Sequence, residues 1–143
     1  MDPKVWGPKA WFFLHSVTMA YPVKPSQTEQ QEMYDFFQNL SKILPCYKCR
    51  KHFQMNINKF PLQDAIKSRD ELVKWLIDVH NSVNEATGKP KESYKSMIKQ
   101  INDEYKNGGK LKTKKIFNNT NFSLLIICLL YTSPSPRDAH ESR

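Results

Sequence analysis

Apolar residues recur every three or four positions along this chain up to Tyr105, and Pro, Gly, Ser or Asn separates one run from the next. This spacing places apolar side chains on one face of a helix. A strand would need strict alternation of apolar and polar residues, and the sequence shows no such pattern. A chain of 143 residues has room for one domain around one core. The sequence therefore predicts an all-α fold, a four-helix bundle plus a short fifth helix.

Five helices can be bounded by their start and stop signals. Pro22 and Pro45 end the first two, because the residue before a proline disfavours the helical conformation. Ser68, with Glu71 three residues later, forms a capping box that starts the fourth. The expected helices cover about residues 4–21, 26–44, 46–60, 68–87 and 92–105. Their expected apolar faces include Trp11, Leu14, His15 and Thr18 in the first helix, Met33, Phe36, Phe37, Leu40, Ile43 and Leu44 in the second, and Tyr94, Ile98, Ile101 and Tyr105 in the fifth.

The positive charge of the chain is concentrated after the expected domain. The net charge is +8, and much of the excess lies in a run of lysines beyond Tyr105 that lacks interleaved aromatic residues. That distribution argues against nucleic-acid binding, which needs a basic surface on the fold. We expect a domain at residues 1–105 and a basic, low-complexity, disordered tail at 106–143. The apolar run 122–131 is too short to span a bilayer, which takes about 20 residues.

Cys46 and Cys49 are the residues most able to carry chemistry. They lie one turn apart at the start of an expected helix, close enough to form a disulfide. The helix N-terminus stabilises a thiolate, and Lys48, Arg50 and Lys51 add positive charge, so exchange with another dithiol becomes feasible. Three cysteines in the whole chain are too few for a disulfide-stapled secreted scaffold.

Two other interpretations of the cysteine pair remain open from the residues alone. A zinc site would add His52 and His80 as ligands, although that spacing matches no common structural zinc site, and we expect no bound metal. Two buried structural cysteines are the other alternative. A thioredoxin-like fold is excluded because the chain offers no strands beside the motif. A helical redox protein remains the favoured hypothesis, and it implies a cofactor that accepts electrons.

His80 and Asn84 lie one turn apart on the fourth expected helix, so both polar side chains point the same way beside an apolar stripe. A solvated helix edge would give the same pattern. The aromatic residues, Trp6, Trp11 and Trp75 among them, are equally consistent with an ordinary core. By themselves these residues do not establish a site.

The motifs taken together resemble one family in order and spacing, the Erv/ALR sulfhydryl oxidases. The resemblance covers about residues 4–105. It rests on Trp6-Gly7, Trp11, Leu14-His15, Tyr21-Pro22, Pro45-Cys46-x-x-Cys49, Glu71-Leu72-x-x-Trp75-Leu76-x-x-x-His80-Asn81-x-Val83-Asn84 and Gly88-Lys89-Pro90.

This resemblance implies a helical bundle that holds FAD at its mouth, usually as a homodimer, and passes electrons from substrate dithiols to oxygen with release of hydrogen peroxide. It implies that Cys49 contacts the flavin and that Cys46 exchanges with the incoming thiol. The implied cofactor-binding residues are Gly7, Lys9, Trp11, His15, Tyr21, His80, Asn81, Val83, Asn84 and Lys89.

The chain departs from the family pattern in its cysteines. Ile77 stands where many members carry a structural cysteine, and Cys128 is the only cysteine outside the active pair. A single cysteine cannot form an intramolecular shuttle disulfide, so Cys128 is either inert or joins a second chain, and we expect it to be inert. Without a shuttle pair, the resemblance to compact viral members implies that the enzyme oxidises its protein partner directly at Cys46. The partner would be a thiol protein, such as a thioredoxin-like protein or a Cys-x-x-Cys carrier.

The start at Met1-Asp2-Pro3-Lys4 shows no apolar run before a cleavage site, so we expect no secretory signal. That leaves the mitochondrial intermembrane space for a cellular protein, and the cytoplasm or virion for a viral one. The competing hypotheses for function are a zinc-stabilised helical interaction module and a redox-inactive homologue.

Overall fold

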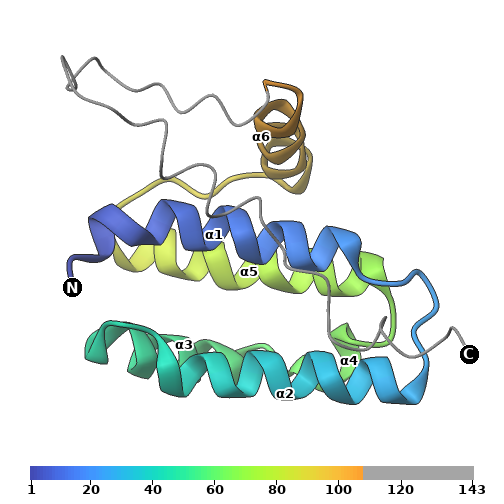
Figure 1. Ribbon diagram of the computed structural model, residues 1–143. Helices are drawn as coiled ribbons and strands as arrows, with labels where there is room; N and C mark the ends of the chain where they lie inside the picture. Colours follow the sequence, from blue (N-terminus) through green and yellow to red (C-terminus); the bar gives the residue numbers. More distant parts are fainter. Residues whose placement is uncertain (108–143) are drawn as a thin grey trace, which may run out of the picture. The chain divides into compact units, whose positions relative to one another are not determined.

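The computed structural model describes residues 1–107, in which six helices are joined by loops and no strand is present (Figure 1). The all-α prediction is confirmed. The helices are α1 Pro3–Ala20, α2 Gln27–Ile43, α3 Tyr47–Lys59, α4 Leu62–Ala65, α5 Arg69–Ala86 and α6 Tyr94–Lys106.

Side chains cap the start of every long helix. Asp2, Ser26, Cys46, Ser68 and Ser93 each accept a hydrogen bond from a backbone N–H in the first turn that follows. Such caps satisfy amide groups that have no partner inside the helix. The caps explain why the expected helix starts agree closely with the observed ones.

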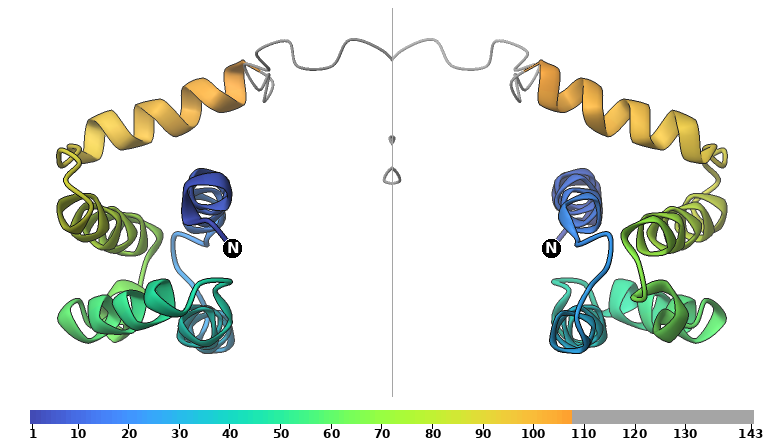
Figure 2. Two further views of the ribbon diagram at one scale, coloured as in Figure 1. Left: turned by 90° about the vertical axis from the view of Figure 1, so that its left-hand side faces the viewer. Right: turned by 90° about the vertical axis from the view of Figure 1, so that its right-hand side faces the viewer.

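The helices pack in pairs. α1 lies beside α5, α2 lies beside α3, and α6 packs on α1 and α5 (Figures 1 and 2). α5 runs antiparallel to α1, so the N-terminal part of α1 and the C-terminal part of α5 meet at one end of the bundle, where α3 begins (Figure 1). The core between the helices is formed by apolar side chains that include Leu14, Phe37, Phe53, Ile57, Leu62, Leu72, Trp75, Leu76 and Val79.

Three residues of the expected apolar faces are exposed in the structure. Ile43 is 71% exposed because α2 ends there and the chain turns toward α3. Tyr94 and Tyr105 are exposed at the two ends of α6, where Tyr94 donates a hydrogen bond to Asp78 Oδ1 and Tyr105 lies 5.2 Å from the ring of Phe12. The expectation that Ile43 lies on the packed face of α2 was therefore wrong. Tyr94 and Tyr105 contact α5 and α1, as expected of a face that docks the last helix, although both side chains stay exposed.

The helix α4 was not expected. It has four residues, yet Leu62 at its start is completely buried. One turn is too short to show a periodic pattern, so only tertiary packing identifies it.

Apart from Lys106 and Asn107 at the end of α6, the expected tail lies outside the described residues, as do its apolar run 122–131 and Cys128, so the domain boundary at residue 105 stays a prediction. Among residues 1–107, no helix is both long enough and apolar enough to cross a bilayer.

Candidate active site

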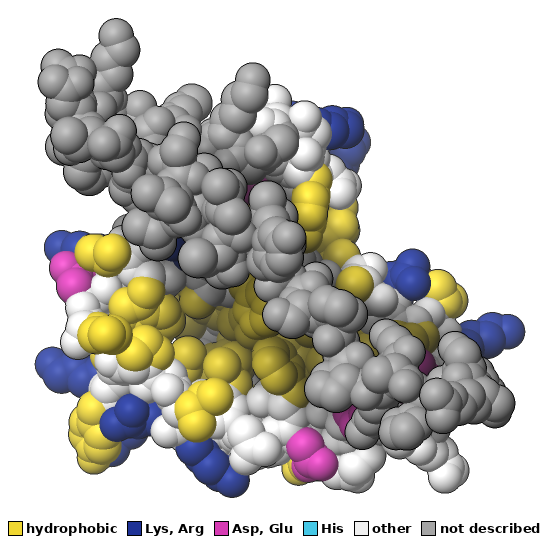
Figure 3. All heavy atoms as spheres, viewed as in Figure 1, with side chains coloured by type: hydrophobic (Ala, Val, Ile, Leu, Met, Phe, Trp, Pro, Cys, Tyr) yellow, Lys and Arg dark blue, Asp and Glu magenta, His cyan; other side chains and the backbone are white. Residues whose placement is uncertain are grey.

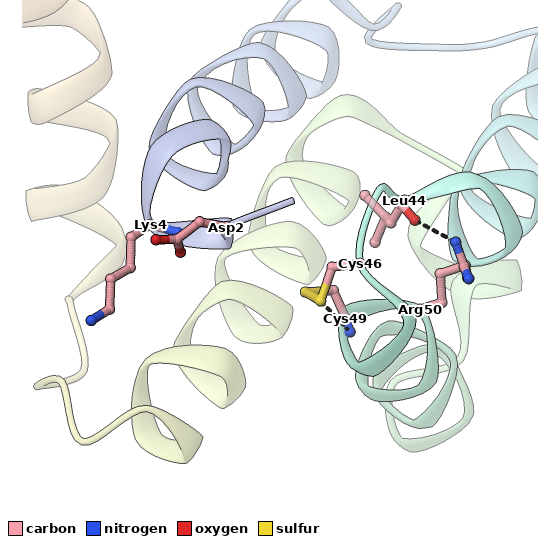
Figure 4. The surroundings of a disulfide bond; sticks show 6 residues. All are labelled: Asp2, Lys4, Leu44, Cys46, Cys49 and Arg50. Carbon is pink, nitrogen blue, oxygen red and sulfur yellow. Dashed lines mark hydrogen bonds between the residues drawn. A yellow bond between two sulfur atoms is a disulfide. The ribbon is translucent and has the colours of Figure 1, made fainter.

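The Cys46–Cys49 pair forms a disulfide at the start of α3, with Cα atoms 5.1 Å apart (Figure 4). Cys46 is the N-cap residue, and its Sγ accepts a hydrogen bond from the backbone N–H of Cys49 at 3.2 Å. Pro45 directly precedes it and prevents α2 from running on. The sulfurs therefore lie where the partial positive charge of a helix N-terminus favours a thiolate.

Arg50 fixes the turn that leads into this disulfide. Its Nη1 donates a hydrogen bond to the Leu44 carbonyl at 2.8 Å, and its backbone N–H donates to the Cys46 carbonyl at 3.0 Å (Figure 4). The sequence indicated Arg50 only as a nearby positive charge. Its contact with Leu44, six residues earlier, depends on the path of the turn and has no signal in the sequence.

Trp11, His15 and His80 form a second cluster, between α1 and α5. The Trp11 and His80 rings are stacked, with centroids 3.9 Å apart and an interplanar angle of 5°. His15 Nε2 and His80 Nδ1 lie 3.0 Å apart and share one hydrogen bond, one neutral ring donating and the other accepting. The structure thus brings together three residues that the family resemblance assigned to the cofactor.

Burial keeps both histidines of this cluster uncharged. Desolvation lowers the pKa of His15 from 6.5 to about 4. The pKa of His80 is likewise about 4, because of desolvation first and the charges of His15 and Lys89 second. At neutral pH the cluster therefore presents flat, neutral rings with hydrogen-bonding edges.

The loop after α5 is held next to this cluster. Asn81 Nδ2 donates to the Glu92 carbonyl and Asn81 Oδ1 accepts from the Glu92 N–H, both at 2.9 Å. The Lys89 N–H donates to the Asn84 carbonyl at 2.8 Å, and Gly88 between them has a φ of 72°, which favours glycine. Lys89 is thereby kept close enough to His80 to affect its pKa.

The remaining predicted site residues lie at varying distances along α1 and α5. Gly7 and Lys9 precede Trp11 on α1, and Val83 lies one turn from the end of α5. A Cβ on Gly7 would meet no atom of residues 1–107 within 4 Å, so packing within this part of the chain does not explain a glycine there.

Tyr21 is not brought to the cluster. It follows the last residue of α1, its hydroxyl donates to the Ile66 carbonyl at 2.9 Å, and its own carbonyl accepts from Arg69 Nε. Its side chain is buried among apolar residues of the core. These contacts tie α1 to the segment between α4 and α5.

The zinc hypothesis has no support in this geometry. The two sulfurs are bonded to each other, His52 is exposed on α3, and His80 is hydrogen-bonded to His15. Among residues 1–107, no three His, Cys, Asp or Glu side chains are grouped as metal ligands would be.

The sequence model of the Erv1/Alr family matches residues 8–106. The chain belongs to the Erv1/Alr family. The resemblance found in the sequence is thereby confirmed, over the stretch that contains both the disulfide and the Trp11–His80 stack.

Individual relatives agree with this assignment. A "Probable FAD-linked sulfhydryl oxidase" of Acanthamoeba polyphaga mimivirus is 42% identical over 102 residues, which cover 71% of this chain and 71% of that protein. The "Mitochondrial FAD-linked sulfhydryl oxidase erv1" of Schizosaccharomyces pombe is 36% identical over 84 residues, 59% of this chain and 46% of that protein. The chain therefore matches less than half the length of this mitochondrial relative.

Solved structures give the same fold. The crystal structure of the FAD binding domain of Erv1 from Saccharomyces cerevisiae matches with a TM-score of 0.64 at 33% identity, over 76% of this chain and 97% of that one. The crystal structure of the yeast Erv1 core matches with a TM-score of 0.66 at 34% identity, over 72% of this chain and 86% of that one.

Proposed function

We propose that this chain is an FAD-dependent thiol oxidase that forms disulfides in protein substrates. One observation carries the proposal: an oxidised cysteine pair caps α3 within an Erv1/Alr helical bundle. Two relatives of this chain are named FAD-linked sulfhydryl oxidases. No observation favours a second function.

The chain's residues fit a flavin nucleotide. The Trp11 and His80 rings offer planar faces, and both imidazoles are neutral at pH 7 because their pKa values are about 4. Lys89 is an exposed cation beside His80, suited to a phosphate. The Trp6 indole N–H is buried and lacks an acceptor within residues 1–107, so a donor at this end of α1 remains available.

The cysteine pair carries the exchange with substrate. A substrate thiolate attacks Cys46 Sγ, the Cys46–Cys49 bond breaks, and Cys49 leaves as a thiolate stabilised at the start of α3. The second substrate thiol, as a thiolate, then attacks the substrate sulfur of the mixed disulfide. This releases Cys46 as a thiolate and leaves the substrate with a disulfide. FAD, when bound, supplies the two-electron chemistry that restores the Cys46–Cys49 disulfide and passes both electrons to oxygen, giving hydrogen peroxide.

The assignment of Cys46 to substrate and Cys49 to flavin is part of the proposal, as are the roles of Gly7, Lys9, Trp11, His15, Tyr21, His80, Asn81, Val83, Asn84 and Lys89. It is supported by the family membership and, for the Trp11, His15 and His80 cluster, by the geometry. Asn81 is hydrogen-bonded to the Glu92 backbone at both ends of its amide, so its role includes holding the loop that carries Lys89.

A homodimer is also part of the proposal. Hydrophobic side chains gather over α1 and α2 in Figure 3, and Phe13 on α1 is 57% exposed. A groove nearby is lined by Val17, Tyr21, Pro22, Glu29, Glu32, Met33 and Phe36. An apolar surface of this kind fits an interface between identical subunits. Analytical ultracentrifugation of the wild type and of Phe13→Glu tests it, and a monomeric wild type would refute it.

The substrate would be a thiol protein such as a thioredoxin-like protein or a Cys-x-x-Cys carrier. The relatives include a mitochondrial and a viral protein, so the proposed compartments are the intermembrane space in a cell and the cytoplasm or virion for a virus.

The proposed function is tested by oxygen consumption with dithiothreitol. Wild-type protein loaded with FAD should be yellow and consume oxygen, Cys49→Ser should lose this activity, and Cys128→Ser should retain it. Equal rates for wild type and Cys49→Ser would show that the pair is not the active site and would favour the redox-inactive homologue.

A further inference from the structure

We propose that the outer face of α3 is a docking surface for an acidic segment of the protein substrate, beside the cysteine to be oxidised. We define the α3 outer face as the exposed residues Tyr47, Lys48, Lys51, His52 and Met55. This inference rests on the proposed thiol oxidase function and names the class of substrate that the site favours.

Along the chain, the charged residues on both sides of the disulfide have one sign. From Phe36 to Gln63 the chain contains no Asp or Glu, while it contains Lys42, Lys48, Arg50, Lys51 and Lys59. The disulfide lies in the middle of this stretch. A surface of one charge sign next to a reactive group attracts a partner of opposite sign and raises its rate of association.

These cations are not neutralised by the rest of the described fold. Within residues 1–107 the ion pairs all involve other lysines, namely Lys67, Lys74, Lys91 and Lys99. Outside α3, Figure 4 draws two charged residues near the disulfide, Asp2 and Lys4 at the start of α1, and their charges are opposite. Asp2 Oδ1 accepts a hydrogen bond from the Lys4 N–H as the cap of that helix.

Tyr47 organises the cations next to the sulfur of Cys46. It is 62% exposed, Lys51 Nζ lies 4.8 Å from its ring centroid, and the Arg50 guanidinium carbon lies 5.8 Å from it. Cation–π contacts of this kind restrict long side chains that would otherwise move freely. The result is an aromatic platform flanked by positive charge, next in sequence to Cys46.

The helical spacing extends this platform along α3. Tyr47, Lys51 and Met55 follow each other at four-residue intervals, and Lys48 and His52 form the adjacent row. Met55 is 66% exposed, so an apolar group lies behind the cations. A substrate segment that combines Asp or Glu with an apolar side chain near its cysteine would complement both features.

The experiment measures kcat/KM for oxygen consumption by the FAD-loaded full chain. The substrates are two reduced Cys-x-x-Cys peptides that are identical except for flanking Asp/Glu in one and flanking Lys in the other, with uncharged dithiothreitol as reference. The acidic peptide should be preferred by about tenfold at low salt, since several exposed charge pairs each contribute a small factor. The preference should largely disappear near 1 M salt, where the screening length falls to about 3 Å.

The variant Lys48→Gln/Lys51→Gln should reduce the ratio of acidic to basic peptide, with each rate normalised to dithiothreitol in the same variant. Lys24→Gln/Lys95→Gln removes the same charge from the loop after α1 and from α6, and should leave the ratio unchanged. Equal losses in the two double variants would overturn the assignment to α3.

The outcomes separate this inference from the proposed function. If dithiothreitol is oxidised but the wild type does not distinguish the peptides, the docking surface is refuted and the oxidase stands. If dithiothreitol is not oxidised, both fail. A thiol-free oligonucleotide that binds α3 more tightly than the acidic peptide would also overturn the inference, because the face would then serve nucleic acid.

Discussion

The stability of the flavin-free protein should fall between about pH 7.5 and about pH 5, because of the buried His15–His80 pair. Both pKa values are lowered from 6.5 to about 4, so between these values the unfolded chain binds protons that the folded chain does not. Stability then rises with pH, is fully present above 6.5 and is lost as the pH falls toward 4. At about pH 5 an unfolded imidazole is largely protonated, which corresponds to about 2 kcal/mol per histidine.

The pair together should therefore lose about 2 to 4 kcal/mol over this range. The lower figure applies if the folded state accepts one proton, because a single imidazolium can still donate across the 3.0 Å contact from His15 Nε2 to His80 Nδ1. A second proton would place two donors face to face. Hydrogen bonds from Ser26 and from Lys99 lower the pKa values of Glu29 and Asp103 from 4.5 and 3.8, so these two carboxylates titrate below this range.

Urea unfolding at the two pH values measures this difference. His80→Gln should remove about half of the pH dependence, while the same substitution at His52, which is exposed on α3, should leave it unchanged. An unfolding free energy that is equal at both pH values would refute the burial argument. An equal effect of the two substitutions would refute the assignment to the pair.

Three further changes test the core, the stack and the turn. Leu76→Ala, at a completely buried position, should destabilise by about 2–5 kcal/mol in urea unfolding, whereas Ile43→Ala, at an exposed one, should change stability by less than about 0.5 kcal/mol. Trp11→Ala removes the ring stacked on His80 and should lower the flavin content measured by visible absorbance; unchanged content would exclude a role for the stack. Arg50→Gln removes the guanidinium bond to the Leu44 carbonyl and should cost about 1–3 kcal/mol, so a wild-type unfolding midpoint would contradict its role in the turn.

Much of the fold was predictable because its determinants are local. Caps such as Ser26 and Ser68 and the proline before Cys46 act within a few residues, and the observed helices begin near them. The short α4 was not predictable, since one helical turn has no period and is held by the burial of Leu62. Ile43 matched the apolar pattern of α2 but lies at its end, where none of the six described helices covers it.

The candidate site was predictable only in part. The cysteine pair is visible in sequence because its two members are one turn apart. The contact between His15 and His80 joins residues 65 positions apart, so it depends on how α1 and α5 pack. The family resemblance assigned Asn81 to the cofactor, but a sequence match cannot show that its amide is bonded to the Glu92 backbone.

Because Cys46 is the N-cap of α3, the hydrogen bonding at the start of this helix depends on the redox state of the cysteine pair. Its Sγ accepts the Cys49 N–H in the oxidised protein, and a thiolate at the same place is a stronger acceptor than a disulfide sulfur. Each reduction should therefore tighten the first turn of α3, and each oxidation should loosen it. Hydrogen–deuterium exchange at the Cys49 amide would follow the redox state of the pair from the backbone itself, without reference to the colour of the flavin.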